Sequence, residues 1–323
     1  MVFTYIRDWL FDAPTLPPIS KSAFSVKRFP LNPIIQPGML PVADGDNING
    51  PSLIRAPEWL PGGLGKYYLY FAHHRGSYIR LAFANLLQGP WTIYEPGTLH
   101  LSQVPTCRDH IGSPDVHVDH ARRQIRMYFH GPLALGKCQK SFVATSADGI
   151  NFQAHDGVLG VFYLRMLRLQ TEWIGMAKGG VMYRSQDGLT QFHRLPVTAF
   201  PINDPQGNTP GSVRHVALQL TGSTLFVYFT RIGDAPECIL RSRIDLDTPE
   251  EKWTTVQPEL VLRPEKSWEG GNLPLHPSKP GQSKARENAV RDPAIFLDDG
   301  RLFLLYSVAG EGGIAIAELG EGV

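Results

Sequence analysis

The segment 113–119 (SPDVHVD) places two carboxylates and an imidazole on alternate positions of a sequence typical of a buried strand. Side chains of a strand alternate between its two faces, so we expect Asp115, His117 and Asp119 on one face and the intervening valines on the other. Burying a charge without a partner costs several kcal/mol, so packing alone does not explain such a strand. The pattern indicates a place where charged side chains serve binding or acid–base chemistry.

Two further segments place ionisable side chains at the ends of apolar strands. The run HHRG at 73–76 follows the aromatic strand YYLYFA, and RDP at 291–293 opens the strand RDPAIFL. Histidine and arginine can bind a polar or anionic ligand, or they can be satisfied by backbone carbonyls. Asp292 can likewise bind a ligand or cap a strand start, and Asp115 can act in a site or pair with Arg214.

The elements that must position these side chains are strands. Few stretches keep a helical period, and 32 glycines and 27 prolines punctuate the chain. Strand-like runs recur in five groups of similar order, at approximately 48–97, 111–157, 161–196, 212–262 and 288–320. Four short antiparallel strands repeated around a ring are typical of a β-propeller. We therefore predict an all-β fold, with one five-bladed propeller domain over residues 1–323; two stacked β-sandwich domains are the alternative.

The fifth group lacks its outermost strand, which the N-terminal run SAFSVKRFPL at 22–31 can supply. We expect the ring to close by pairing of the N-terminal and C-terminal segments, which removes exposed sheet edges.

This topology gathers polar side chains at one face of the ring. First-strand starts, second-strand ends and the loops between blades all converge on one mouth. The polar residues at these positions are Asn49, Asp115, Arg214, His215, Arg291 and Asp292 at first-strand starts; His73, His74, Arg75, His130, Arg231 and Glu311 at second-strand ends; and Asp44, Asp46, Asp109, His110, Trp268, Glu269 and Glu287 in the loops. Such a gathering is the composition of a polar-ligand pocket.

The chain resembles the five-bladed propeller glycoside hydrolases of family 43 and its relatives in families 32, 68, 117 and 130, from about residue 30 to the end. FPLNPIIQPG at 29–38 is similar to their entry segment. SPDVHVD resembles the second-blade strand that carries the second aspartate of family 43, which implies that Asp115 orients substrate and tunes the acid. RDPAIF at 291–296 resembles the motif with which family 32 holds sugar hydroxyls, which implies that role for Arg291 and Asp292.

One position departs from the family pattern. Family 43 opens its first blade with an aspartate that serves as general base, whereas NINGPSL here has Asn49. An amide cannot take a proton at neutral pH, so we expect Asn49 to bind a sugar hydroxyl. The candidate catalytic residues are Asp46 or Asp292 as base and Glu287 as acid, or a histidine acid as in family 117 (His74 or His215).

The other polar positions are expected to contact substrate; they are His73, Arg75, His110, His130 and Arg214. Trp268, in the loop SWEGGN, either stacks on a pyranose ring or anchors its loop. His117 is expected to face the central channel. In related propellers a channel histidine helps hold a calcium ion, which implies a structural calcium here, although calcium prefers several oxygen ligands. We expect no required cofactor.

Composition excludes several classes of function. The net charge is +1 without a long basic run, so a nucleic-acid partner is not expected. No segment reaches transmembrane length, and the first 18 residues lack the apolar core of a signal peptide. The three cysteines are odd in number and lack metal-binding spacing. We expect a cytoplasmic protein with a small carbohydrate partner and no membrane partner; the sequence leaves its oligomeric state open.

Three functions follow from these observations. The first is a glycoside hydrolase acting on a short oligosaccharide or glycoside by acid/base catalysis. The second is a glycoside phosphorylase, in which histidines and arginines of the mouth bind phosphate. The third is a non-catalytic carbohydrate-binding propeller that has kept the pocket and lost the base.

Overall fold

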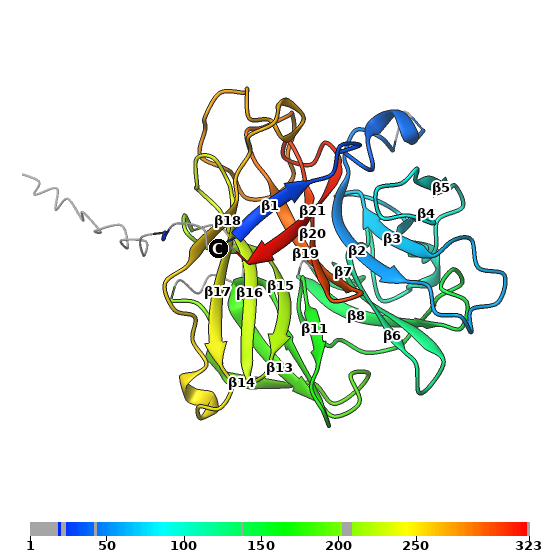
Figure 1. Ribbon diagram of the computed structural model, residues 1–323. Helices are drawn as coiled ribbons and strands as arrows, with labels where there is room; N and C mark the ends of the chain where they lie inside the picture. Colours follow the sequence, from blue (N-terminus) through cyan, green and yellow to red (C-terminus); the bar gives the residue numbers. More distant parts are fainter. Residues whose placement is uncertain (1–18, 21–23, 42–43, 137, 202–208, 322–323) are drawn as a thin grey trace, which may run out of the picture.

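The computed structural model describes residues 19–20, 24–41, 44–136, 138–201 and 209–321. Five antiparallel sheets form the blades of a β-propeller, which confirms the predicted all-β fold (Figure 1). The inner strands of neighbouring blades contact one another around the axis.

The blades share one plan, in which consecutive strands pair from the axis outward. Their strands are β2 (Asn49–Arg55), β3 (Tyr67–Ala72), β4 (Arg80–Ala84) and β5 (Thr92–Tyr94) in blade 1; β6 (Gly112–Asp119), β7 (Gln124–Pro132) and β8 (Gln139–Ser146), with β9 (Gln153–Ala154) and β10 (Gly160–Val161), in blade 2; β11 (Arg165–Arg168), β12 (Trp173–Met176), β13 (Val181–Ser185) and β14 (His193–Thr198) in blade 3; β15 (Val213–Thr221), β16 (Thr224–Arg231), β17 (Ile239–Asp245) and β18 (Glu259–Leu262) in blade 4; and β19 (Arg291–Asp298), β20 (Arg301–Ser307), β21 (Ile314–Glu321) and β1 (Phe24–Arg28) in blade 5.

Within the described ranges, five short 3-10 helices lie in the connections; they are η1 (Pro37–Met39), η2 (Leu101–Gln103), η3 (Lys178–Gly180), η4 (Glu250–Lys252) and η5 (Ser267–Glu269). Both β9 and β10 pair with β8, so residues 160–161 belong to blade 2, and blade 3 begins at Arg165.

The ring closes as predicted, through its two terminal strands. β1 pairs antiparallel with β21, with Phe24 opposite Glu321 and Arg28 opposite Ala317. The two strands, blue and red in Figure 1, lie side by side although they come from opposite ends of the chain. Blade 5 therefore needs both ends of the polypeptide.

The blade cores explain why β3 is apolar on both faces. Tyr67, Leu69 and Phe71 pack in a cluster shared with blade 5, and Tyr68 and Tyr70 pack in a cluster shared with blade 2. A blade has a neighbour on each face, so its middle strands lose the alternation of a one-sided sheet. Burial of each large side chain stabilises the fold by about 1.5–3 kcal/mol.

The inner strands β2, β6 and β19 share an irregular start. A register shift separates Asn49 from Ser52 in β2, and the same shift occurs at the starts of β6 and β19. The residue before proline has a positive φ in each case: 59° at Gly50, 47° at Ser113 and 53° at Asp292. The residue before the proline therefore stays near the mouth, and the residue after it enters the regular register of the channel wall.

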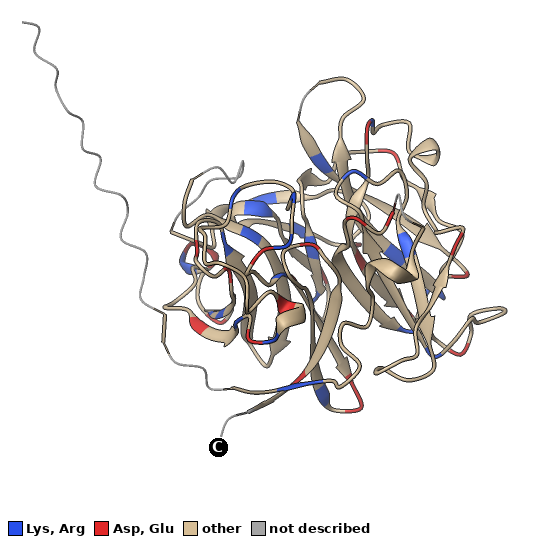
Figure 2. Ribbon diagram, turned by 90° about the horizontal axis from the view of Figure 1, so that it is seen from above, with Lys and Arg blue, Asp and Glu red and all other residues tan. Residues whose placement is uncertain are grey.

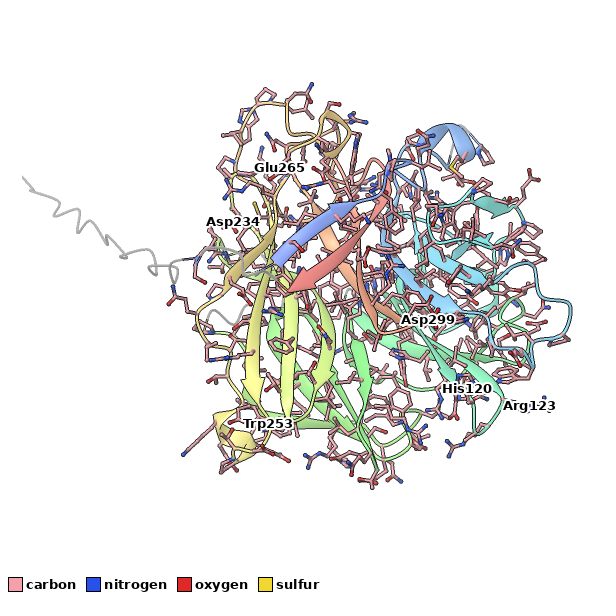
Figure 3. The ribbon with its side chains drawn as sticks, in the orientation of Figure 1. His120, Arg123, Asp234, Trp253, Glu265 and Asp299 are labelled. Atoms are coloured by element: carbon pink, nitrogen blue, oxygen red, sulfur yellow. The ribbon has the colours of Figure 1, made fainter. Side chains whose placement is uncertain are left out.

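Turns at the two ends of the strands define the two faces of the ring. Figure 3 labels Asp234 and Glu265 in loops at the upper end of the view and Trp253 in the connection at the lower end.

Basic and acidic residues are interspersed over the view in Figure 2 and do not separate into two regions. Among the described residues, no helix has the length and hydropathy needed to cross a bilayer.

Candidate active site

The mouth of the propeller holds a small pocket whose walls come from four blades and from the links between blades 1 and 2 and between blades 2 and 3. It is lined by Asn49, His73, His74, His110, Gly112, Ser113, His130, Tyr163, His215 and Glu311. The sequence analysis predicted a polar mouth, and the structure brings seven of its residues to this one pocket. The free volume is about 10 Å³, which is close to the space one water molecule needs.

Asp292 and His215 form a buried pair beside this pocket. The carboxylate of Asp292 contacts Nδ1 of His215 from the neighbouring blade and accepts a hydrogen bond of 2.9 Å from Ser307 Oγ. Burial raises the pKa of Asp292, but His215, the charge of Arg291 and the Ser307 hydroxyl together hold it well below its usual value. Burial lowers the pKa of His215 more than Asp292 raises it.

His74 and Glu311 form a second pair in the pocket wall. Nδ1 of His74 lies 3.6 Å from Oε1 of Glu311, whose side chain is 5% exposed. Asn47 donates to the other carboxylate oxygen of Glu311, and its own Oδ1 accepts hydrogen bonds of 2.8 Å from Asn49 Nδ2 and from the backbone N–H of His74. Burial raises the pKa of Glu311, but the hydrogen bond and charge of His74, together with Arg291, bring it below its usual value.

The aromatic ring of Tyr163 lies between two of the histidines. Its centroid is 4.3 Å from that of His130 and 4.0 Å from that of His215. Burial holds the pKa of His130 well below 6.5, and the nearby His110 adds to this shift. Sequence reasoning missed Tyr163, although it precedes the inner strand of blade 3, where the other blades carry site residues.

Arg214 and Arg291 are held by a carboxylate that sequence reasoning also missed. Glu237 is fully buried and lies 2.9 Å from Arg214 Nε and 3.0 Å from Arg291 Nη2. Burial raises the pKa of Glu237, but the two guanidinium groups lower it below its usual value. These arginines were expected to contact substrate, but they lie outside the pocket lining and join blades 4 and 5.

Three predicted residues lie at the rim or beyond it. Asp46 Oδ1 is 2.8 Å from His73 Nε2, and the backbone N–H of Arg75 donates to His73 Nδ1. Glu287 Oε2 is 2.6 Å from Arg291 Nη2 and lines a separate cavity. Trp268 does not reach the pocket, because it packs against the core cluster between blades 4 and 5.

Asp115 and His117 line the central channel and not the mouth pocket. The register shift at the start of β6 leaves Ser113 at the mouth and moves Asp115 opposite Tyr128. Asp115 Oδ2 is 2.9 Å from His117 Nε2 and accepts a hydrogen bond of 2.7 Å from the backbone N–H of Met166. Burial raises the pKa of Asp115, but His117 and Arg165 bring it below its usual value.

The channel does not fit the calcium ion that the resemblance implies. Calcium prefers six to eight oxygen ligands, and the channel wall around His117 is mostly apolar. No group of three or more His, Cys, Asp or Glu side chains in the described part of the chain is arranged to hold a metal ion.

Comparison with solved structures places the fold in a known class. A glycosyl hydrolase from Bacteroides ovatus superposes with a TM-score of 0.65 at 11% identity, covering 97% of this chain and 95% of that one. A thermostable family-43 glycoside hydrolase gives 0.60 at 15% identity, with coverages of 84% and 88%. A family-43 β-xylosidase/α-arabinofuranosidase from a compost metagenome, in complex with xylotriose, gives 0.59 at 12% identity, with coverages of 87% and 93%. The chain therefore has a propeller fold like that of family-43 glycoside hydrolases.

Sequence comparison gives a nearer relative. The uncharacterized protein R118 of Acanthamoeba polyphaga mimivirus is 38% identical over 322 residues, covering 91% of this chain and 90% of the viral protein. The chain belongs to the same family as this viral protein. No protein-family model matches it.

Proposed function

We propose that the protein is a glycoside hydrolase that acts on a short oligosaccharide or glycoside at the mouth pocket. The observation that carries this proposal is that two imidazole–carboxylate pairs, His215–Asp292 and His74–Glu311, border the same pocket. Hydrolysis of a glycosidic bond needs one group to activate water and another to protonate the leaving oxygen. The likeness of the fold to family-43 hydrolases supports a glycoside as substrate.

His215 is suited to be the base that activates water. Its Nδ1 contacts Asp292, and its Nε2 has no hydrogen-bond partner among the described residues. Because burial lowers its pKa, the imidazole is neutral near pH 7 and Nε2 can accept a proton. The carboxylate fixes the tautomer that leaves this nitrogen free, and the pocket has room for about one water molecule.

His74 is suited to be the proton donor. Glu311 is ionised at neutral pH because its pKa is lowered, and its Oε1 lies 3.6 Å from Nδ1 of His74. The side chain of His74 is 24% exposed, so a leaving group can reach it from the rim.

The test is hydrolysis of nitrophenyl pyranosides, nitrophenyl furanosides and xylotriose by the wild-type protein and by His215→Gln and His74→Gln. We expect each variant to lose about 100-fold or more in kcat with little change in KM. His193→Gln, an exposed histidine of β14, is the matched control and should keep wild-type rates. Wild-type rates in both pocket variants would refute these roles, and a wild-type protein that hydrolyses no glycoside would refute the function.

The roles proposed from the sequence are tested in the same assay. Glu287→Gln, Asp46→Asn and Asp115→Asn should lower kcat if these carboxylates act on substrate. A change in KM alone would assign them to binding.

A non-catalytic carbohydrate-binding protein is the second candidate, and one observation favours it. Asn49 stands where the resemblance places the family-43 base, and its amide donates to Asn47. Calorimetric binding of a sugar that survives long incubation intact would support this function. The phosphorylase hypothesis gains nothing from Arg214 and Arg291, since Glu237 holds both; hydrolysis that does not depend on phosphate would reject it.

A further inference from the structure

A second cavity lies in the loop that links blades 4 and 5. It has a volume of about 630 Å³ and is formed by residues 273–289. This volume falls within the range of about 300–1,000 Å³ that is usual for small-molecule sites. It is much larger than the mouth pocket, so a sugar ring has space here.

The loop that forms this cavity is fixed by buried groups. Arg214 donates to the carbonyl oxygens of Lys279 (2.5 Å) and Gly281 (3.2 Å), and the backbone N–H of Gly233 donates to the carbonyl oxygen of Ser278. Asn288 Nδ2 donates to the carbonyl of Leu273 across the loop. The cavity is therefore preformed, which reduces the entropic cost of binding a ligand.

The charged side chains of the wall are mainly basic. Lys279, Lys284 and Arg286 line the cavity, and in the described residues no ion pair joins any of them to a carboxylate. Arg286 donates weakly, at 3.4 Å, to the carbonyls of Ser267 and Trp268. The one carboxylate of the wall, Glu287, is neutralised by Arg291. A concave surface with this charge attracts an anionic group.

One buried oxygen in the cavity wall, Oδ1 of Asn288, can accept a hydrogen bond from a ligand hydroxyl. Asn288 is 9% exposed and lines the cavity, and its Oδ1 is buried without a hydrogen-bond partner among the described residues. An unsatisfied buried acceptor is costly, so a donor from a ligand is favoured there. An anion that also carries hydroxyl groups satisfies both the basic side chains and this oxygen.

The cavity is coupled to the mouth pocket through one guanidinium. Arg291 contacts Glu287, in the cavity wall, at 2.6 Å and Glu311, in the pocket wall, at 3.8 Å. Loop residue Ser283 also packs closely against Gly310, which precedes Glu311. Arg291 therefore connects the wall of the cavity to the wall of the mouth pocket.

We propose that this loop cavity is a binding subsite for an anionic sugar, one that carries a carboxylate, sulfate or phosphate group. The proposal rests on the proposed function only in taking the ligand as a sugar. Lys279 and Lys284 bind the anionic group, and Oδ1 of Asn288 accepts a hydrogen bond from a sugar hydroxyl.

The test is calorimetric titration of the full-length protein with glucose, glucuronic acid, glucose 6-sulfate, glucose 6-phosphate and inorganic phosphate. At low ionic strength we expect at least one anionic sugar to bind about tenfold more tightly than glucose, since two exposed cations attract its charged group. The advantage should shrink as salt is added. Comparison of the three anionic sugars identifies which anionic group is preferred.

The double variant Lys279→Gln/Lys284→Gln should bind the preferred anionic sugar no better than glucose. Lys252→Gln, which changes an exposed lysine of η4, is the matched control and should keep the preference. Equal binding of glucose and all anionic sugars, or a preference that survives the double variant, would overturn the proposal. Inorganic phosphate binding as tightly as the best sugar would overturn its sugar part.

These outcomes are independent of hydrolysis. Anionic preference without cleavage of any glycoside supports the subsite and refutes the hydrolase. Cleavage of neutral glycosides without anionic preference supports the hydrolase and refutes the subsite.

Discussion

Two aspartate–histidine pairs, one at the mouth and one in the channel, share a sequence context and differ in environment. Asp292 precedes Pro293 and pairs with His215 of the neighbouring blade, whereas Asp115 follows Pro114 and pairs with His117 two residues along its own strand. The side chain of Asp292 is 1% exposed, and that of Asp115 is 15% exposed. Whether the aspartate precedes or follows the proline thus decides whether the carboxylate lies at the mouth or in the channel.

The difference teaches that the partner determines what such a pair can do. A histidine from another blade joins the two blades and presents its free nitrogen to the mouth. A histidine on the same strand pairs with its aspartate without joining a second blade. The ring of His117 packs edge-on against Tyr128 and Trp173 in the channel. We therefore expect mutations in the mouth pair to have larger effects.

The largest difference is expected in stability. Asp292→Asn removes the carboxylate that contacts the buried His215 and accepts from Ser307, and it should lower the free energy of unfolding by about 3 kcal/mol. Asp115→Asn keeps an acceptor for Met166 and should cost about 1 kcal/mol. Urea denaturation of both variants measures this; equal losses would remove the distinction between the two pairs.

The pH dependence of activity should report the mouth pair. The base role proposed for His215 requires a neutral ring, so kcat/KM should fall as the pH drops through its pKa, which burial places below the ordinary value of 6.5. In this acidic range the rate should fall about tenfold per pH unit. Asp115→Asn should leave unchanged the pH at which kcat/KM falls. A fall in kcat/KM centred above pH 6.5 would contradict the assignment of His215 as the base.

Acid should destabilise the wild-type protein more than the Asp292→Asn variant. The pKa of Asp292 is lowered by folding, so its contribution is present above the unfolded pKa of about 3.9 and is lost as the pH falls towards the folded value. Below pH 4 the slopes of unfolding free energy against pH should differ by about 1.4 kcal/mol per unit. Denaturation at several pH values measures this, and parallel slopes would exclude the effect.

The smallest effect is expected for His117→Asn. The ring is 26% exposed, and Asp115 keeps Met166 and Arg165 as partners, so the loss of unfolding free energy should be about 0.5–1 kcal/mol. Thermal unfolding measures it. A loss as large as that of Asp292→Asn would show that the channel pair is as important as the mouth pair.

The sequence by itself determined the repeat, the class of fold and the face at which the candidate site lies. Runs of β-branched and aromatic residues between Gly and Pro turns predict five sheets, and the missing strand of blade 5 predicts its partner near residue 24. Strand direction then fixes which ends meet at the mouth, so Asn49, His74, His215 and Glu311 could be placed there from topology alone. These features depend on local pattern and chain direction, which one sequence carries.

Only the tertiary structure decided which side chains pair. Glu237 forms ion pairs with both Arg214 and Arg291, Asp115 lines the channel, and Trp268 packs against the core. The physical reason is that partners such as His215 and Asp292 lie on different blades, and one-residue register shifts at the starts of the inner strands set which atoms meet. The energies of such contacts depend on distances between segments far apart in the chain, which no local pattern specifies.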